Sequence, residues 1–137
     1  MTADYFLNLL FEEYSKNYIN VCENNAESLE KQKRNVADFS YKTAISDEES
    51  QKLSRKICAK ILHTFMEKVL NLPDVDWTFS KSLKDIYECA VCANSIAQVV
   101  ERGIMKPKYA DSFGLNDTVS AEETEEIIFA LRYFFAK

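Results

Sequence analysis

The chain has 137 residues and a formal net charge of −5 at pH 7, and it contains only two glycines and two prolines. This length suits one domain, residues 1–137, and so few turn-forming residues favour long helices over a β-sandwich or barrel. The acidic balance argues against nucleic-acid binding, which needs a basic stripe on the protein surface.

The N-terminal part of the chain predicts two helices. Apolar residues recur every three or four positions over residues 3–21, which is typical of an amphipathic helix. A second and more polar helix is expected over residues 28–41. Its buried side would consist of Leu29, Val36 and Phe39.

A third helix is expected over residues 50–70. The sequence "SDEE", which begins at Ser46, is a capping-box pattern that starts a helix, and Pro73 ends it. The apolar residues of its buried side are Leu53, Ile57, Ile61, Leu62, Phe65, Met66 and Val69.

The pattern over about residues 78–102 is apolar nearly all round, so we expect a central helix that is buried on nearly all sides. Gly103 is a C-terminal helix signal. The apolar residues of the expected central helix are Leu83, Ile86, Tyr87, Ala90, Val91, Ala93, Ile96, Ala97, Val99 and Val100. A last helix follows a second capping box at Ser120, and its buried stripe is Ile127, Ile128, Leu131, Phe134 and Phe135. The predicted fold is an all-α bundle wrapped around one buried helix.

The only tryptophan lies in "LPDVDWTFSKSL", between the third helix and the central helix. Asp74 or Asp76 is expected to cap the central helix, which would place Trp77 near its first turn. The structural interpretation is that Trp77 pins this helix start against the C-terminal helix. The functional interpretation places the same corner at one end of a groove between the two long helices.

Reactive side chains give little sign of chemistry. Cys89 and Cys92 form a C-x-x-C pair, but redox activity favours a helix N-terminus and the pattern places the pair in mid-helix. A zinc site would need two further ligands, and Cys22, Cys58 and His63 are not paired at ligand spacing. His63, the only histidine, has no obvious serine or cysteine partner, and it is expected on a helix surface. We therefore predict no catalytic residues, no metal site and no cofactor, so the protein is not expected to be an enzyme.

The sequence also predicts a cytoplasmic protein. No apolar run approaches the ~20 residues that a membrane span requires, and the N-terminus lacks the cationic leader of a signal peptide. The chain ends at "RYFFAK" without a membrane anchor. Four cysteines without a secretion signal indicate reduced thiols.

The order of these elements resembles the Bcl (B-cell lymphoma two) family of apoptosis regulators, and in particular its compact, viral-type pro-survival members. That family opens its buried helix with Asn-Trp-Gly-Arg, and "DWTF", residues 76–79, occupies this place. The segment "ADFSYKTAIS", residues 37–46, is similar to the family's lead into its groove-forming helices. The resemblance covers roughly the whole chain. Thr78 and Phe79 stand where the family has glycine and arginine, and that arginine pairs with an aspartate of the bound helix.

The resemblance implies an inhibitor of apoptosis that sequesters the Bcl homology 3 helix of a pro-apoptotic, Bim-like protein. The helix would lie in a hydrophobic groove between the second helix and the third. The implied groove residues are Val36, Phe39, Ile61, Phe65, Met66, Asp76, Thr78, Phe79 and Ile86. Without the arginine we expect the protein to bind a narrower range of partners. Apolar anchors of the bound helix would contribute about 1.5–3 kcal/mol each to binding.

Self-association as a homodimer is also expected, because an open apolar channel is poorly solvated. Two alternatives stay open. One is a thiol-dependent redox protein that uses Cys89 and Cys92, and the other is a helical scaffold without a groove.

Overall fold

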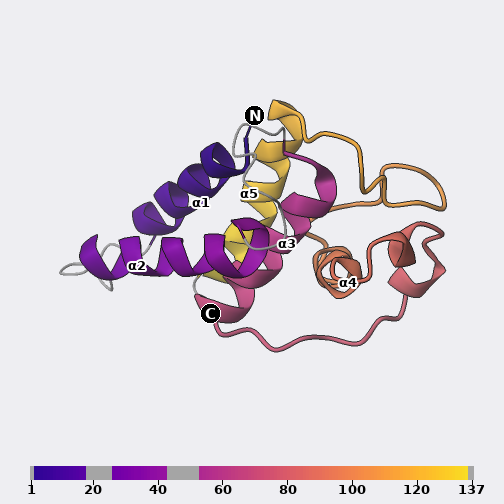
Figure 1. The fold of residues 1–137 in the computed structure, drawn as a ribbon, viewed down its shortest axis with the longest axis horizontal. Coiled ribbons are helices and arrows are strands. Elements are labelled where there is room, and N and C mark those ends of the chain that lie inside the picture. Colours follow the sequence, from indigo (N-terminus) through magenta and orange to yellow (C-terminus); the bar gives the residue numbers. More distant parts are fainter. Residues whose placement is uncertain (1, 18–25, 43–52, 136–137) are drawn as a thin grey trace.

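The structure is a computed structural model that describes residues 2–17, 26–42 and 53–135 (Figure 1). These residues form an all-α fold without strands, although Ser54 and Thr118 form an isolated bridge, so the predicted class is confirmed. The α-helices are α1 (Ala3–Asn17), α2 (Ala26–Ala37), α3 (Arg55–Lys68), α4 (Ala93–Glu101) and α5 (Ala121–Phe135). A π-helical turn, η1 (Asp38–Lys42), continues α2, and two 3-10 turns, η2 (Ser80–Ser82) and η3 (Ile86–Glu88), precede α4.

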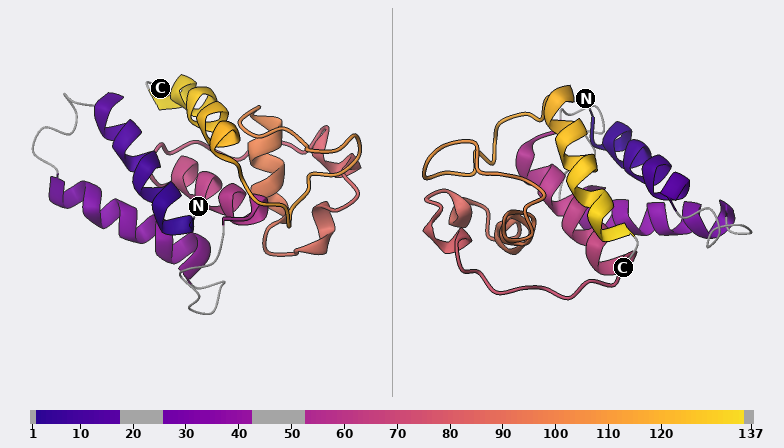
Figure 2. Two further views of the ribbon diagram at one scale, coloured as in Figure 1. Left: turned by 90° about the horizontal axis from the view of Figure 1, so that it is seen from above. Right: turned by 180° about the vertical axis from the view of Figure 1, so that it is seen from behind.

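Helix α3 is the element around which the others are arranged. It contacts α1, α2 and η1 on one side and α4 on the other. Figure 2 shows α4 and the long loops before and after it set apart from α1 and α2 by α3. Over the residues that the structure describes, no helix combines the length and the apolar character that crossing a bilayer requires.

The core is richest in aromatic side chains where α1, α3 and α5 meet. Phe65 of α3 lies edge-on to Phe11 and Tyr14 of α1, with ring centroids 5.3 and 5.4 Å apart. Tyr14 in turn lies 5.5 Å from Phe135 of α5. We call these four residues the aromatic core. Their edge-to-face geometry adds to the stabilisation that burial of the rings provides.

The predicted helix starts are confirmed only in part. Ser120 accepts a hydrogen bond from the Glu123 backbone N–H at 3.0 Å, as the second capping box requires. The first capping box lies outside the described residues, and α3 is capped instead by Ser54, whose hydroxyl accepts from Ile57 N at 3.3 Å. The expected end of the first helix, residues 18–21, also lies outside them.

The prediction of a continuous central helix over residues 78–102 is wrong, because only Ala93–Glu101 is α-helical. Backbone and side-chain groups of residues 78–92 instead form hydrogen bonds with other parts of the chain. The Asp85 carboxylate accepts hydrogen bonds from Phe113 N and Gly114 N, each at 2.8 Å, which ties the segment to a loop far along the chain. A disulfide between Cys89 and Cys92 closes the turn just before α4.

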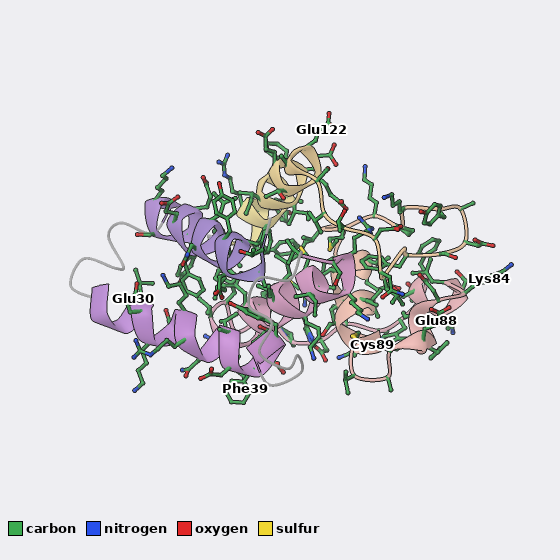
Figure 3. The ribbon with its side chains drawn as sticks, turned by 45° about the horizontal axis from the view of Figure 1, so that its top comes forward. Glu30, Phe39, Lys84, Glu88, Cys89 and Glu122 are labelled. Atoms are coloured by element: carbon green, nitrogen blue, oxygen red, sulfur yellow. A yellow bond between two sulfur atoms is a disulfide. The ribbon has the colours of Figure 1, made fainter. Side chains whose placement is uncertain are left out.

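The prediction that Phe39 is buried is also wrong. Its side chain is 62% exposed, and Figure 3 shows it pointing away from the body of the molecule. The π-helical turn explains the change, because its wider turn keeps Ser40 and Tyr41 in line with buried Val36 and leaves Phe39 outside.

Candidate functional site

The tryptophan corner, defined here as residues 73–80, is held by one polar face of α4. Asn94, Gln98 and Glu101 are spaced by four and three residues, so they lie on the same side of the helix. The Gln98 side chain pairs with the backbone of Val75 in both directions: Oε1 accepts from Val75 N at 2.8 Å, and Nε2 donates to Val75 O at 2.9 Å. The Gln98 amide thus forms hydrogen bonds with both the N–H and the carbonyl of the Val75 backbone, as a neighbouring β-strand would.

Glu101 fixes the end of the corner. One carboxylate oxygen accepts from Phe79 N and Ser80 N, both at 2.8 Å, and from the Ser80 hydroxyl at 2.9 Å. The other accepts from the Thr78 hydroxyl at 2.9 Å. Burial acts to raise the pKa of Glu101, but these hydrogen bonds outweigh it and lower the pKa to about 2. The carboxylate is therefore ionised at neutral pH and holds residues 78–80 in place.

Trp77 lies half-buried near the first turn of α4, although by a different route from the one predicted. Its indole N–H donates to Asn94 Oδ1 at 2.9 Å, and its ring lies 6.1 Å from that of Tyr87. Asn94 and Tyr87 thus take the place that the sequence assigned to the C-terminal helix. The predicted aspartate cap is wrong, because the N-cap of α4 is Cys92 and makes no side-chain capping bond.

His63 has two polar partners that the sequence did not reveal. Its Nδ1 lies 3.0 Å from the Ser95 hydroxyl, and its Nε2 lies 2.8 Å from an Asp74 carboxylate oxygen. The order of burial is opposite to that of a hydrolytic triad, because Ser95 is buried in α4 and Asp74 is exposed. A buried hydroxyl does not reach a substrate, so the contacts serve to join α3, the corner and α4.

Asp74 also accepts a hydrogen bond from Asn94 Nδ2 at 2.8 Å. Burial acts to raise the pKa of Asp74, but the bonds from His63 and Asn94, together with the charge of Arg102, lower it overall. These partners lie 11, 20 and 28 residues from Asp74 in or next to other helices, far beyond the three- and four-residue spacing of one helix face, so no local pattern could have indicated them.

The structure divides the implied groove residues into two groups. One group is at most 1% exposed and belongs to a single core cluster: Val36, Ile61, Phe65, Met66 and Ile86. The exposed group is Phe39, Asp76, Thr78 and Phe79. Val36 lies in α2, and Ile61, Phe65 and Met66 lie in α3, so these four are part of the closed core of the two helices. Ile86 lies in η3, which contacts α4. Phe39 is the exposed aromatic at the contact between α2–η1 and α3, and the Lys68 amino group of α3 lies 4.5 Å from the centre of its ring.

The prediction that the cysteine pair lies in mid-helix is wrong, and so is the expectation that these two thiols are reduced, because they form a disulfide. Cys92 is the N-cap of α4, and it is bonded to half-buried Cys89. Cys58 is fully buried in α3, and burial raises the pKa of its thiol far above the ordinary value. Within the described ranges, no three or more His, Cys, Asp or Glu residues are grouped so that they could hold a metal ion.

Two surface hollows meet at Phe129 of α5, a residue that the sequence analysis did not single out. The first, of about 670 Å³, lies between α5 and α1 and is lined by Tyr5 and Leu9. The second, of about 910 Å³, lies between α5 and the loop 103–108. Phe129 is 75% exposed. The available sequence signal was a large apolar residue that falls outside the buried stripe of its helix.

No family model, no curated protein and no solved structure matches this chain. The Bcl-family resemblance therefore stays a prediction, and so do the groove and the partner that it implies.

Proposed function

We propose that this chain is a cytoplasmic, non-enzymatic member of the Bcl family, built as a Bcl-like helical bundle. It would inhibit apoptosis by sequestering the Bcl homology 3 helix of a pro-apoptotic, Bim-like protein. The partner's helix would bind against α3, at the contact with α2–η1. The observation that carries the proposal is the exposed aromatic ring of Phe39 at this contact.

Phe39 is one of several large apolar side chains that the structure leaves exposed. It is 62% exposed on a π-helical turn, between buried Val36 on one side and buried Ser40 and Tyr41 on the other. Single π-turns inside helices are frequently found at functional sites. An amphipathic helix that covered Phe39 would remove a large apolar ring from water, which favours binding.

The proposal requires α2–η1 to move, because the contact with α3 is closed in this structure. Helix α2 is polar, and Val36 and Ala37 are its described fully buried side chains. A partner helix with several apolar anchors, at about 1.5–3 kcal/mol each, could replace the contacts of α2 with α3. The free energy of opening would lower the observed affinity, since only the open form binds.

Lys68 is the cation best placed to substitute for the missing arginine. It lies beside Phe39, and it could pair with the aspartate of the partner helix. Lys84, which lies a few residues after the position of the family's arginine, is already paired with Asp111 at 3.0 Å. A charge-assisted hydrogen bond contributes about 1.5–3 kcal/mol, so Lys68 could restore much of the lost contact.

Calorimetry with a panel of synthetic Bcl homology 3 peptides tests the function. We expect at least one peptide to bind, and Phe39→Glu to weaken that binding at least about tenfold. Phe129→Glu is the matched control, because this ring is also exposed but lies on α5. The proposal is wrong if the whole panel fails to bind, or if both variants weaken binding equally.

A charge swap tests the role of Lys68. Lys68→Glu should weaken binding, and a peptide whose aspartate is changed to lysine should recover part of it. If the swapped peptide recovers nothing, the aspartate does not contact Lys68.

Self-association at the same surface is the second part of the proposal. Exposed Phe39 would lose water if a second copy of the chain covered it, which favours a homodimer. Sedimentation should detect dimers of the natural chain at high concentration and fewer of Phe39→Glu. Monomer at every concentration would contradict this part alone.

A further inference from the structure

The Cys89–Cys92 disulfide joins residues only three positions apart. A crosslink stabilises a fold chiefly by restricting the unfolded chain, and the restriction is smallest when the closed loop is shortest. This bond fastens one turn to the next and leaves distant elements unlinked. Stabilisation of the fold is therefore a weak explanation for this disulfide, and a chemical role is the alternative.

The location of the pair suits thiol chemistry. Cys92 occupies the N-cap of α4, a helix of nine residues whose first backbone N–H groups face this end. These N–H groups and the helix dipole stabilise a thiolate, and no side chain caps the terminus in competition. Cys92 is only 3% exposed, whereas Cys89 is half-buried and is the sulfur that an incoming group could reach.

Two exposed apolar side chains lie close to the pair in the sequence, one before Cys89 and the other between the two cysteines. Tyr87 is 64% exposed and Val91 is 72% exposed, and Trp77 packs beside the Tyr87 ring. Figure 3 shows Cys89 near Glu88, on the side of the molecule away from Glu30, with Lys84 farther out at the tip. We call Tyr87 and Val91 the apolar collar. Such a collar suits a protein segment with its own apolar residues, rather than a small polar thiol.

We infer that Cys89 and Cys92 form a redox-active pair that oxidises a cysteine pair on a partner protein with apolar flanking residues. A partner thiolate attacks Cys89 Sγ, the intramolecular S–S bond breaks, and its electron pair leaves on Cys92 Sγ as a thiolate at the α4 N-terminus. The second partner thiolate then attacks the partner's own sulfur in the mixed disulfide and releases Cys89 as a thiolate. The partner loses two electrons and two protons and becomes a disulfide, while this pair becomes a dithiol. A low-molecular-weight disulfide, such as glutathione disulfide, regenerates it by the reverse exchange.

This activity goes beyond the proposed helix binding and does not depend on it. The two sites use different residues, since Phe39 and Lys68 belong to η1 and α3. Failure of peptide binding would leave the thiol chemistry standing, and failure of exchange would leave the binding proposal standing.

The first experiment equilibrates the full chain in glutathione buffers of graded oxidation and traps thiols with a mass-tagging maleimide. Cys22→Ser is used as the background to remove an unrelated thiol. We expect Cys89 and Cys92 to pass together from oxidised to reduced within the range of these buffers. A pair that stays a disulfide in excess glutathione, or a dithiol in excess glutathione disulfide, would overturn the inference.

The second experiment separates the two sulfurs. Each single variant is offered a peptide with one activated mixed disulfide and flanking leucines. Cys92→Ser, which keeps the accessible Cys89, should form a stable mixed disulfide at least tenfold faster than Cys89→Ser, which keeps the buried Cys92. Equal rates in the two variants contradict the assigned roles. Circular dichroism of both variants checks that helix content is retained, so a difference in rate does not reflect unfolding.

The collar is tested in the chain with both cysteines present. Val91→Ser should slow oxidation of a dithiol peptide flanked by leucines several-fold more than oxidation of reduced glutathione. Phe129→Ser, an exposed aromatic on α5, is the control and should leave both rates unchanged. If Val91→Ser slows both substrates equally, or neither, the collar does not recognise apolar partners.

Discussion

Where α1, α3 and α5 meet, aromatic rings pack edge to face, whereas around α4 carboxylate and amide side chains hold a loop by its backbone. Phe65 is fully buried among rings from two other helices. Glu101 and Gln98 instead bind the backbone of residues 75–80 through hydrogen bonds of 2.8–2.9 Å. The first region depends on burial of apolar area, and the second on directed polar contacts.

The difference has consequences for function. Apolar packing is stable over a wide range of pH, while a loop held by ionised carboxylates responds to protonation. The exposed aromatics Phe79 and Tyr87 and the Cys89–Cys92 pair all lie in the polar region. A loop that a rigid helix positions is a common place for binding and catalytic groups. The aromatic core thus supports the fold, while the polar region around α4 carries exposed aromatic side chains and the cysteine pair.

The largest expected effect comes from breaking the aromatic core. Phe65→Ala removes a ring that contacts Phe11, Tyr14 and Phe135, and should lower the free energy of unfolding by about 3–5 kcal/mol. Urea denaturation followed by circular dichroism measures it. The control is Phe129→Ala on α5, which should change the value by less than about 0.5 kcal/mol because the ring is exposed. Similar losses in both variants would contradict the assignment of Phe65 to the core.

The second-largest effect is expected from removing the charge of the Glu101 carboxylate, which holds the tryptophan corner. Glu101→Gln removes the charge that accepts hydrogen bonds from Thr78, Phe79 and Ser80, and should cost about 1.5–3 kcal/mol. Hydrogen exchange should speed up at Phe79 N and Ser80 N more than in the aromatic core. Glu126→Gln on the exposed side of α5 is the matched control. Unchanged exchange at these two amides would mean that Glu101 does not hold the corner.

Acid should separate the two regions. The pKa of Glu101 is about 2 in the folded chain, below its ordinary 4.5, and the pKa of Asp74 is lowered too. The unfolded chain therefore binds more protons than the folded one, so this stability is present above the unfolded pKa and is lost as pH falls from about 5 towards 2.

Two spectroscopic signals follow this separation. Trp77 is the only tryptophan, so its fluorescence reports on the corner alone, while circular dichroism reports on all helices. We expect the fluorescence to change at higher pH than the dichroism, and Glu101→Gln to weaken the pH dependence. Coincident changes in the natural chain would mean that both regions unfold as one unit.

The same contrast explains which features the sequence predicted. Helices α1, α3 and α5 were found because their apolar spacing is a local property of residues three and four apart. The extent of the helix over residues 78–102 was wrong, because Asp85 binds backbone groups 28 and 29 residues away. The exposure of Phe39 depends on one π-turn, which apolar spacing does not encode.

The candidate sites were predicted less completely than the helices. The two cysteines were identified from their spacing, but their place at a helix N-terminus followed from where α4 begins. Five of the nine implied groove residues are in the core. The sequence could not predict this, because an apolar residue on a helix face gives the same pattern whether it lines a groove or is buried in the interior. The His63 contacts with Asp74 and Ser95 come from three separate segments, and no spacing rule joins them.

The smallest expected effect refines the role of the tryptophan. Trp77→Phe removes the indole N–H that donates to Asn94, but Asn94 Oδ1 keeps a second donor, Gln98 Nε2, at 3.1 Å. Because no buried acceptor is left without a partner, the loss should be only about 0.5–1.5 kcal/mol in urea denaturation followed by circular dichroism. Asn94→Ala should cost more than Trp77→Phe, since it removes the acceptor for Trp77 and the donor to Asp74 together. If Trp77→Phe were instead as damaging as Phe65→Ala, the indole would be a core anchor, and the corner would depend on burial as the aromatic core does.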